Sequence, residues 1–129
     1  MKIPITILAV LVILLGGTAG GFFWWRAASA PGPYDDFAKC LGEKGLKFYG
    51  AYWCPHCLNQ KKLFGKSAKY LPYIECAIPG SEELKQDCRE KGVKGFPTWT
   101  GLDNWRAEGE IDLATLAERS GCALEHQAP

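Results

Sequence analysis

The sequence lacks an excess of charge of either sign, with 15 Lys and Arg against 14 Asp and Glu among its 129 residues. Basic and acidic side chains are interleaved, so the chain offers no basic surface of the kind that binds nucleic acid. It also lacks internal repeats and low-complexity tracts. With the N-terminal segment set aside, enough residues remain for one hydrophobic core but not for two. We therefore expect one globular domain and no nucleic-acid partner.

The sequence also lacks a ligand set for a metal ion or a haem group. Its only C-x-x-C pair is Cys54 and Cys57, and zinc needs further ligands. The two histidines do not complete a zinc site, because His56 lies between the cysteines and His126 lies in the polar tail. Covalent haem attachment needs a histidine directly after the second cysteine, where Leu58 stands. We expect neither a metal nor another cofactor.

Charged side chains are absent from the segment Ile3–Trp25. A segment of this length can cross a hydrocarbon core of about 30 Å as a helix. Lys2 precedes it, Arg26 follows it, and its last four residues are aromatic, which suits a membrane interface. We expect a single-pass anchor at residues 1–26, with the rest of the chain outside the cytoplasm.

A cleaved signal peptide is the alternative to a retained anchor, because Ala28-Ser29-Ala30 matches the small-residue pattern of a cleavage site. Both alternatives export the domain. The six cysteines agree with export, since a high and even count in a short chain suits an oxidising compartment. We expect a periplasmic, extracytoplasmic or lumenal domain at residues 34–124, after a linker at 27–33 and before a tail at 125–129.

Apolar periodicity and turn residues predict an alternation of helices and strands in this domain. Strands are expected at 46–52, 73–76, 96–100 and 105–110, and helices at 34–43, 55–65, 81–92 and 113–119. The expected signals at the helix ends are Pro55, Ser81, Asp112 and Gly121. This order predicts an α/β sandwich with a mixed sheet flanked by helices. A lysine-rich face of the second helix is expected to be solvated, or else to meet anionic lipid or an acidic partner; its members are Lys61, Lys62, Lys66 and Lys69.

The run Trp53-Cys54-Pro55-His56-Cys57 lies where the first strand meets the second helix. Two cysteines with this spacing can close a small disulfide at the helix start. Unpaired N–H groups and the helix dipole stabilise a thiolate there. This setting favours dithiol–disulfide exchange over a purely structural disulfide.

The same motifs carry a resemblance to a known family. The order of elements, the run at 53–57 and the later Gly95-Phe96-Pro97-Thr98 are similar to the thioredoxin-like fold. Residues 35–124 more narrowly resemble the thioredoxin-like domain associated with bacterial and plant vitamin K epoxide reductase homologues. The motifs are Phe48-Tyr49-Gly50-Ala51-Tyr52-Trp53-Cys54-Pro55-His56-Cys57, Lys62-Leu63-Phe64-Gly65, Tyr73-Ile74-Glu75-Cys76 and Phe96-Pro97-Thr98-Trp99. In that family a quinone-linked membrane enzyme reoxidises the domain.

The resemblance implies that Cys54 is the nucleophile and that Cys57 is the more buried, resolving thiol. Pro55 and His56 would set the redox poise, because an imidazole beside Cys54 favours the thiolate and makes the disulfide a better oxidant. Trp53 would lie near the substrate groove.

Phe96 and Pro97 would face the active cysteines, Pro97 as a cis-proline and Phe96 through backbone groups that pair with an extended peptide. One departure from the family pattern concerns Phe48, which stands where reducing thioredoxins carry a buried acid, six residues before the first cysteine. Deprotonation of Cys57 would then depend on water or on another group such as Lys47. These features favour oxidation of client proteins over reduction.

The other four cysteines are expected to form structural disulfides. Cys76 ends a strand and Cys88 lies in the next helix, which favours a bond between them; a second redox relay is the alternative. Cys40 and Cys122 would then pair by elimination, one of several connectivities that six cysteines allow.

Together these features predict a membrane-anchored, extracytoplasmic thiol–disulfide oxidoreductase. Its clients would be reduced or misoxidised exported proteins. A vitamin K epoxide reductase-like or other quinone-linked membrane protein would restore its disulfide. Two alternatives stay open: a reductase or isomerase that receives electrons from the membrane, and a peptide-binding assembly factor without redox activity.

Overall fold

The computed structural model describes residues 4, 7, 17, 20–26 and 30–126. The chain divides into two units, residues 1–30 and 31–129. In the first unit, residues 20–26 are helical, and Phe22, Phe23, Trp24 and Trp25 are exposed. Within the described residues, no helix combines the length and the apolar character needed to cross a membrane. Most of the anchor predicted at 1–26 lies outside the described residues.

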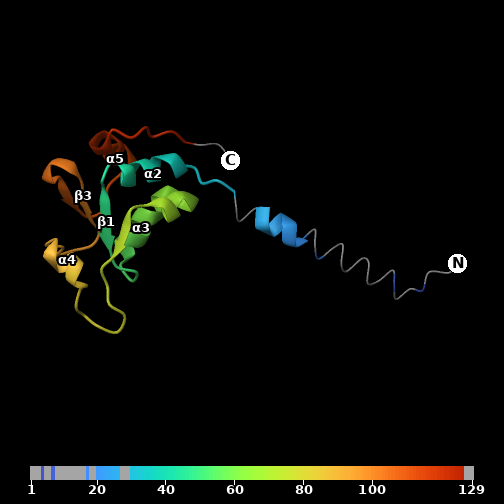
Figure 1. The fold of residues 1–129 in the computed structure, drawn as a ribbon, viewed down its shortest axis with the longest axis horizontal. Coiled ribbons are helices and arrows are strands. Elements are labelled where there is room, and N and C mark those ends of the chain that lie inside the picture. Colours follow the sequence, from blue (N-terminus) through green and yellow to red (C-terminus); the bar gives the residue numbers. More distant parts are fainter. Residues whose placement is uncertain (1–3, 5–6, 8–16, 18–19, 27–29, 127–129) are drawn as a thin grey trace. The chain divides into compact units, whose positions relative to one another are not determined.

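The second unit is built on a four-stranded mixed sheet (Figure 1). Its strand order is β2-β1-β3-β4; β1 is parallel to β2 and antiparallel to β3, and β3 is antiparallel to β4. The strands are β1 (Lys47–Gly50), β2 (Tyr73–Glu75), β3 (Thr98–Thr100) and β4 (Arg106–Glu108). The predicted mixed α/β architecture is confirmed, and this topology is compatible with a thioredoxin-like fold.

Helices connect these strands: α2 (Asp35–Glu43), α3 (Pro55–Phe64), η1 (Gly65–Tyr70), α4 (Gln86–Glu90), η2 (Leu102–Asn104) and α5 (Leu113–Ser120). Local sequence signals set several of their ends. Pro55 occupies the first turn of α3. The Asp112 carboxylate caps α5 by accepting the backbone N–H of Thr115 at 2.9 Å. Gly121 ends α5 in the left-handed conformation, with φ of 69°.

The helix predicted at 81–92 is wrong in its first half, because α4 begins only at Gln86. Ala77 and Leu84 form an isolated antiparallel bridge, which holds the intervening segment beside the end of β2. Ser81 does not cap a helix; its hydroxyl accepts a backbone N–H two residues later, at 3.1 Å, in a local turn. The pairing of Ala77 with Leu84 therefore prevents the helix that the sequence predicts from Ser81 onward.

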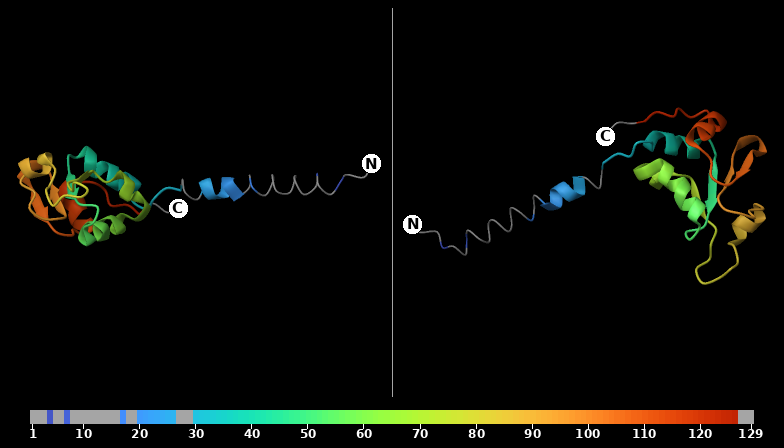
Figure 2. Two further views of the ribbon diagram at one scale, coloured as in Figure 1. Left: turned by 90° about the horizontal axis from the view of Figure 1, so that it is seen from below. Right: turned by 180° about the vertical axis from the view of Figure 1, so that it is seen from behind.

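The two faces of the sheet bury different residues, since successive strand side chains point to opposite faces. Phe48 of β1 joins the larger core with residues of α2, α3 and α5, whereas Tyr49 joins a smaller core with a residue of α4. Figures 1 and 2 show α3 and α4 on opposite sides of β1. Phe48 stacks on Trp99 at 4.7 Å between ring centroids and meets the edge of Tyr73 at 5.1 Å. These three rings fill the face of the sheet beneath the larger core.

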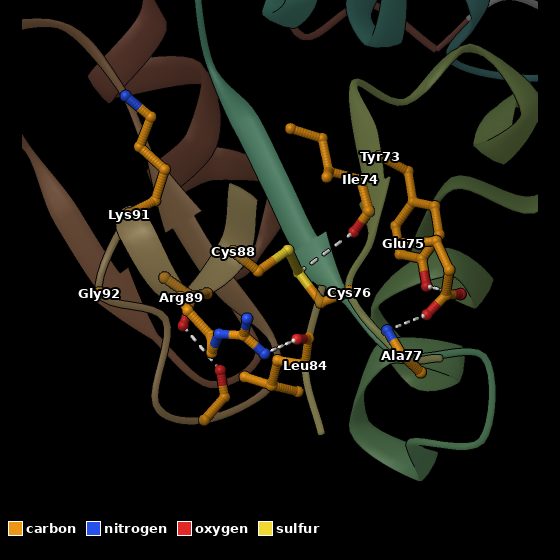
Figure 3. Close-up of a disulfide and its surroundings, with 12 residues drawn as sticks. Tyr73, Ile74, Glu75, Cys76, Ala77, Leu84, Cys88, Arg89, Lys91 and Gly92 are labelled. Carbon is orange, nitrogen blue, oxygen red and sulfur yellow. Dashed lines mark hydrogen bonds between the residues drawn. A yellow bond between two sulfur atoms is a disulfide. The ribbon is translucent and has the colours of Figure 1, made fainter. Parts of the chain in front are cut away.

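Two disulfides fasten helices to the rest of this unit. Cys40 of α2 is joined to Cys122, just beyond α5, with a Cα–Cα distance of 6.0 Å. Cys76, at the end of β2, is joined to Cys88 of α4, with a Cα–Cα distance of 5.8 Å (Figure 3). Cys76 and Cys88 are fully buried and belong to the smaller core, so this disulfide holds α4 against its face of the sheet.

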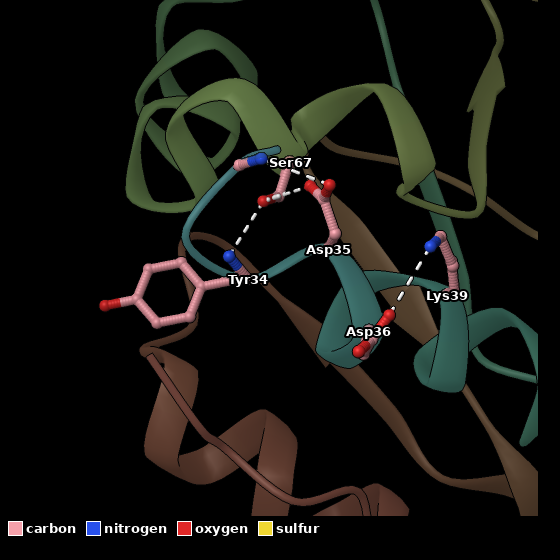
Figure 4. A network of polar contacts seen from close by, with 6 residues as sticks. Tyr34, Asp35, Asp36, Lys39 and Ser67 are labelled. Carbon is pink, nitrogen blue, oxygen red and sulfur yellow. Dashed lines mark hydrogen bonds and ion pairs between the residues drawn. The ribbon is translucent and has the colours of Figure 1, made fainter. Parts of the chain in front are cut away.

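A buried polar cluster fixes the beginning of the second unit (Figure 4). The Asp35 carboxylate accepts hydrogen bonds from the Ser67 hydroxyl at 2.7 Å and from the Gly32 N–H at 3.1 Å. The Ser67 oxygen in turn accepts the backbone N–H of Tyr34 at 2.8 Å. Burial alone would raise the pKa of Asp35, but the hydrogen bonds from Ser67 and Gly32 hold it below its usual value. Residues 31–33, which the sequence assigned to the linker, therefore lie within the folded unit.

Replacing both Cys40 and Cys122 with alanine should lower the free energy of unfolding by about 4 kcal/mol, because their bond closes a long loop in the unfolded chain. The matched double variant Cys76→Ala, Cys88→Ala opens a loop with a sequence separation of only 12 and should cost about 3 kcal/mol. Urea unfolding of each protein, with Cys54 and Cys57 in the same oxidation state, measures both values. A clearly larger loss from the second variant would contradict the loop-entropy account.

Candidate active site

Cys54 and Cys57 are the two free thiols among the six cysteines, all of which are described. Both lie at the start of α3, where Cys54 is the N-cap residue and Cys57 lies in the first turn. They are 5% and 1% exposed. Pro55 takes the first helical position, where a missing N–H removes no intrahelical bond. The sequence predicted this placement, and the helix dipole directs partial positive charge toward Cys54.

The Phe96–Pro97 peptide bond is cis and lies beside Cys54. The Cys54 thiol donates a hydrogen bond to the carbonyl oxygen of Phe96, with 3.7 Å between sulfur and oxygen. The ring of Trp53 contacts the Phe96 ring edge-on, with 6.0 Å between centroids. The structure thus brings together Trp53, Cys54, Phe96 and Pro97, although more than 40 residues separate the two segments.

A hollow of about 540 Å³ adjoins Trp53. Tyr52 and Leu84 contribute to its walls, and Glu82 and Glu83 add acidic groups. Both Tyr52 and Trp53 are more than half exposed, so their rings are accessible from solvent. Sequence reasoning missed this hollow, because it placed the segment at 81–84 in a helix rather than in the loop that borders Trp53.

His56 is exposed and meets a carboxylate that the sequence did not single out. Its Nδ1 lies 2.7 Å from Oε1 of Glu110, and Nδ2 of Asn59 donates to the same oxygen at 3.3 Å. The hydrogen bonds from His56 and Asn59 hold the pKa of Glu110 below its usual value. His56 is therefore set beside an ionised carboxylate. In the described part of the chain, His, Cys, Asp and Glu side chains form no group of three or more that could hold a metal ion.

Gln60 explains why Glu110 lies opposite His56. The Gln60 side chain is fully buried; its Nε2 donates to the carbonyl oxygen of Ile111 at 2.8 Å, and its Oε1 accepts the N–H of Ile111 at 2.7 Å. These paired bonds tie α3 to the segment that precedes α5. Sequence reasoning missed both Gln60 and Glu110, because their contacts join residues more than 50 positions apart.

Cys57 lies against the end of β1, where Gly50 has no side chain. A Cβ at Gly50 would come within 2.8 Å of the Cys57 sulfur and within 2.7 Å of the Tyr73 ring, so this close approach requires glycine. Burial raises the pKa of Cys57 to about 12, and the neighbouring Cys54 adds to the increase. The positive charge of Lys61 acts in the opposite direction.

Phe48 is fully buried at the position where the resemblance places the acid of reducing thioredoxins. Its ring is packed between Trp99 and Tyr73, so this position supplies no proton acceptor. Lys47 lies at the opposite end of β1 from Gly50 and is exposed, beside a different hollow that also includes Arg106. Its position therefore gives no support to the suggestion that Lys47 assists Cys57.

Comparison with known proteins finds a similarity to a plant oxidoreductase. Thiol-disulfide oxidoreductase LTO1 of Arabidopsis thaliana is 42% identical over 103 residues, which cover 76% of this chain and 27% of that protein. The chain thus spans about a quarter of the length of this relative. The similarity supports a thiol–disulfide oxidoreductase. No protein-family model matches the chain.

The high pKa of Cys57 predicts how the reduction potential depends on pH. For each proton that the reduced cysteine pair retains, the reduction potential falls by about 30 mV for every unit by which the pH rises. Because Cys57 keeps its proton up to a pKa of about 12, the potential should keep falling by at least about 30 mV per unit between about pH 8 and pH 11. Equilibration of the protein with a dithiol buffer measures this slope.

The same shift has a consequence for stability. Because the folded state holds the proton of Cys57 more tightly than the unfolded state, the contribution of Cys57 to the stability of the reduced protein is fully present below the ordinary pKa of 9.0. This contribution is lost as the pH rises toward 12.

A reduction potential that stops changing with pH below about pH 10 would show that Cys57 ionises earlier, and would contradict this account of its burial.

Proposed function

We propose that this chain is a thiol–disulfide oxidoreductase with a thioredoxin-like fold, which exchanges the Cys54–Cys57 disulfide with thiols of exported proteins. One observation carries the proposal. The two free thiols lie at the start of α3, with Cys54 3.7 Å from the carbonyl oxygen of Phe96, while the other four cysteines are held in disulfides. The similarity to the Arabidopsis oxidoreductase adds support.

The reaction begins with the Cys54–Cys57 pair in its disulfide form. A client thiolate attacks the sulfur of Cys54, the disulfide bond breaks, and its electron pair leaves with Cys57, which takes a proton from water. A second client thiolate then attacks the client sulfur of this mixed disulfide and expels Cys54 as a thiolate. The client loses two electrons and gains a disulfide, and Cys54 and Cys57 are left reduced.

The surroundings of Cys54 suit a client in extended conformation. A peptide strand beside the Phe96–Pro97 bond can pair with the backbone of Phe96, as in strand addition. The exposed rings of Tyr52 and Trp53, with the adjoining hollow, offer a place for a client side chain. Backbone pairing with one side-chain pocket would accept many sequences, which suits an enzyme with several exported clients.

The direction of exchange that we propose is oxidation of clients. Phe48 leaves the site without the buried acid of reducing thioredoxins, and burial, which raises the pKa of Cys57, makes deprotonation of this thiol difficult. His56 lies between the two cysteines in the sequence, and its Nδ1 is 2.7 Å from Oε1 of Glu110. By resemblance, an imidazole at this position favours the reduced protein, and a stabilised reduced form makes a stronger oxidant.

The location that we propose is the extracytoplasmic or lumenal side of a membrane, with residues 1–26 as the anchor. The uncharged segment and the exposed aromatic residues at 22–25 support an anchor, and the two disulfides agree with an oxidising compartment. A quinone-linked membrane protein of the vitamin K epoxide reductase type would accept the electrons and restore the Cys54–Cys57 disulfide.

Trapping with Cys57→Ser tests the activity. Without the resolving thiol, clients should remain on Cys54 as mixed disulfides that dithiothreitol releases, and mass spectrometry should identify cysteine-containing exported proteins among them. A trapped membrane quinone reductase would identify the electron acceptor. The matched control is Cys54→Ser, Cys57→Ser, which should trap nothing.

Two outcomes would contradict the proposal. One is that Cys57→Ser traps no protein in the oxidising compartment. The other is that the double serine variant keeps the cellular function, which would assign the chain to peptide-binding assembly factors.

The reduction potential tests the direction. We expect a value well above the roughly −270 mV of thioredoxin, toward the roughly −120 mV of strongly oxidising DsbA. His56→Ala should lower the potential, because it removes the imidazole that favours the thiolate, whereas Asn59→Ala should change it less. A potential near that of thioredoxin would instead support a reductase, whatever the trapping experiment captures.

A further inference from the structure

Lys61 occupies α3 four residues after Cys57, a spacing that places both residues on one face of the helix. Its Nζ lies 3.3 Å from the centroid of the Tyr73 ring, whereas Lys39 and Lys69 lie 4.6 and 4.9 Å from the ring of Tyr70. The Lys61 residue is half-buried, unlike the exposed Lys62 next to it. Lys61 therefore does not fit the prediction that the lysines of this helix form one solvated face.

Tyr73 is held firmly beneath this ammonium group. Its hydroxyl donates to Oε2 of Glu75 at 2.7 Å, and Oε1 of Glu75 accepts the backbone N–H of Ala77 at 2.9 Å (Figure 3). The Tyr73 ring also meets the edge of Phe48. Burial and then the hydrogen bond to Glu75 raise the pKa of Tyr73 well above its usual range, so the phenol stays neutral. The ring is thus a fixed, uncharged support for Lys61.

The same ring borders the buried thiol. A Cβ at Gly50 would stand 2.7 Å from a Tyr73 ring carbon and 2.8 Å from the Cys57 sulfur, so both groups converge on one point beside β1. The titratable and charged groups around Cys57 are Cys54 and Lys61 on α3, with Tyr73 and, behind it, Glu75 on β2. Lys61 is the cation of this set, and its charge lowers the pKa of Cys57 against the larger effect of burial.

We propose that Lys61, seated on the ring of Tyr73, is the electrostatic partner of the Cys57 thiolate during disulfide exchange. This inference rests on the proposed function and deepens it. Where reducing thioredoxins use a buried acid to remove the proton from the resolving thiol, this chain has Phe48 and uses a fixed cation to stabilise the resulting anion. Lys61 is a positioning residue, since it acts on the charge of Cys57 and does not itself exchange bonds.

The role of the cation follows from the balance of the step. When a client thiolate bonds to the sulfur of Cys54, the Cys54–Cys57 bond breaks and its electron pair leaves with Cys57. The ammonium group of Lys61 offsets this negative charge until water supplies a proton. In the reverse step, Cys57 gives its proton to water, and the same cation stabilises the attacking thiolate. Lys61 should therefore accelerate exchange in both directions.

The test compares Lys61→Met with Lys61→Arg and with Lys62→Met, the exposed neighbour, in the whole chain. The readout is the rate at which dithiothreitol reduces the Cys54–Cys57 disulfide, followed by tryptophan fluorescence at several pH values. Lys61→Met should slow this rate about threefold to tenfold, because a nearby charge shifts a pKa by roughly one unit or more and the exchange rate follows about half of that shift. Lys61→Arg should restore most of the rate, and Lys62→Met should match the parent chain.

A second readout separates charge from packing. In a Cys54→Ser background, alkylation of Cys57 by iodoacetamide between about pH 8 and pH 10 reports the thiolate fraction. Lys61→Met should slow alkylation, and Lys61→Arg should slow it less. Loss of the contact with the Tyr73 ring should lower the unfolding temperature of the oxidised Lys61→Met variant, so stability alone does not test the charge of Lys61. Alkylation of Cys57 at the parental rate in the Lys61→Met variant would show a purely structural role and overturn the proposal.

Equal reduction rates for Lys61→Met and the parent at every pH would also overturn it. That failure differs from failure of the proposed function. If Cys57→Ser traps clients while Lys61→Met exchanges at the parental rate, only the role of Lys61 is refuted. If Cys57→Ser traps nothing, the exchange activity itself is refuted.

Discussion

Burial of the Cys57 thiol against the backbone of Gly50 is the constraint on which the chemistry of the site depends. Because glycine leaves space at the end of β1, the sulfur is removed from water and its pKa rises to about 12. Cys54, three residues earlier, is the N-cap of α3 and lies beside the Phe96 carbonyl. The helix therefore gives the two cysteines of one motif different surroundings, with Cys54 beside the Phe96 carbonyl and Cys57 against Gly50.

The surroundings of Cys57 follow from this burial. An ionised acid beneath the thiol would have to be buried too, at a large cost in desolvation. Phe48 occupies that place with an apolar ring that stacks on Trp99 and belongs to the larger core. The positive charge that acts on Cys57 comes instead from Lys61, whose ammonium group lies over the ring of Tyr73. The packing of the core and the electrostatics of the thiol are thus set by the same aromatic cluster.

Local signals in the sequence predicted most of the elements and the position of the Cys54–Cys57 pair at the start of α3. Pro55 indicates a helix start because the first helical residue needs no N–H, and Asp112 does so because its carboxylate can cap the helix that follows. Contacts between distant segments could not be predicted, because no periodicity encodes them. The pairing of Ala77 with Leu84 removes half of a predicted helix, and the bonds of Gln60 bring Glu110 to His56. Lys61 was assigned to a solvated face because helical spacing alone does not show which ring lies beneath a side chain.

The central claim is that Cys54 and Cys57 cycle while the other four cysteines remain in structural disulfides. The most direct measurement equilibrates the folded protein in buffers of decreasing redox potential, alkylates free thiols and assigns each modified cysteine by mass spectrometry. We expect Cys54 and Cys57 to become reduced together, before any of the other four. Reduction of the Cys76–Cys88 or Cys40–Cys122 bond at the same or a higher potential would contradict the account.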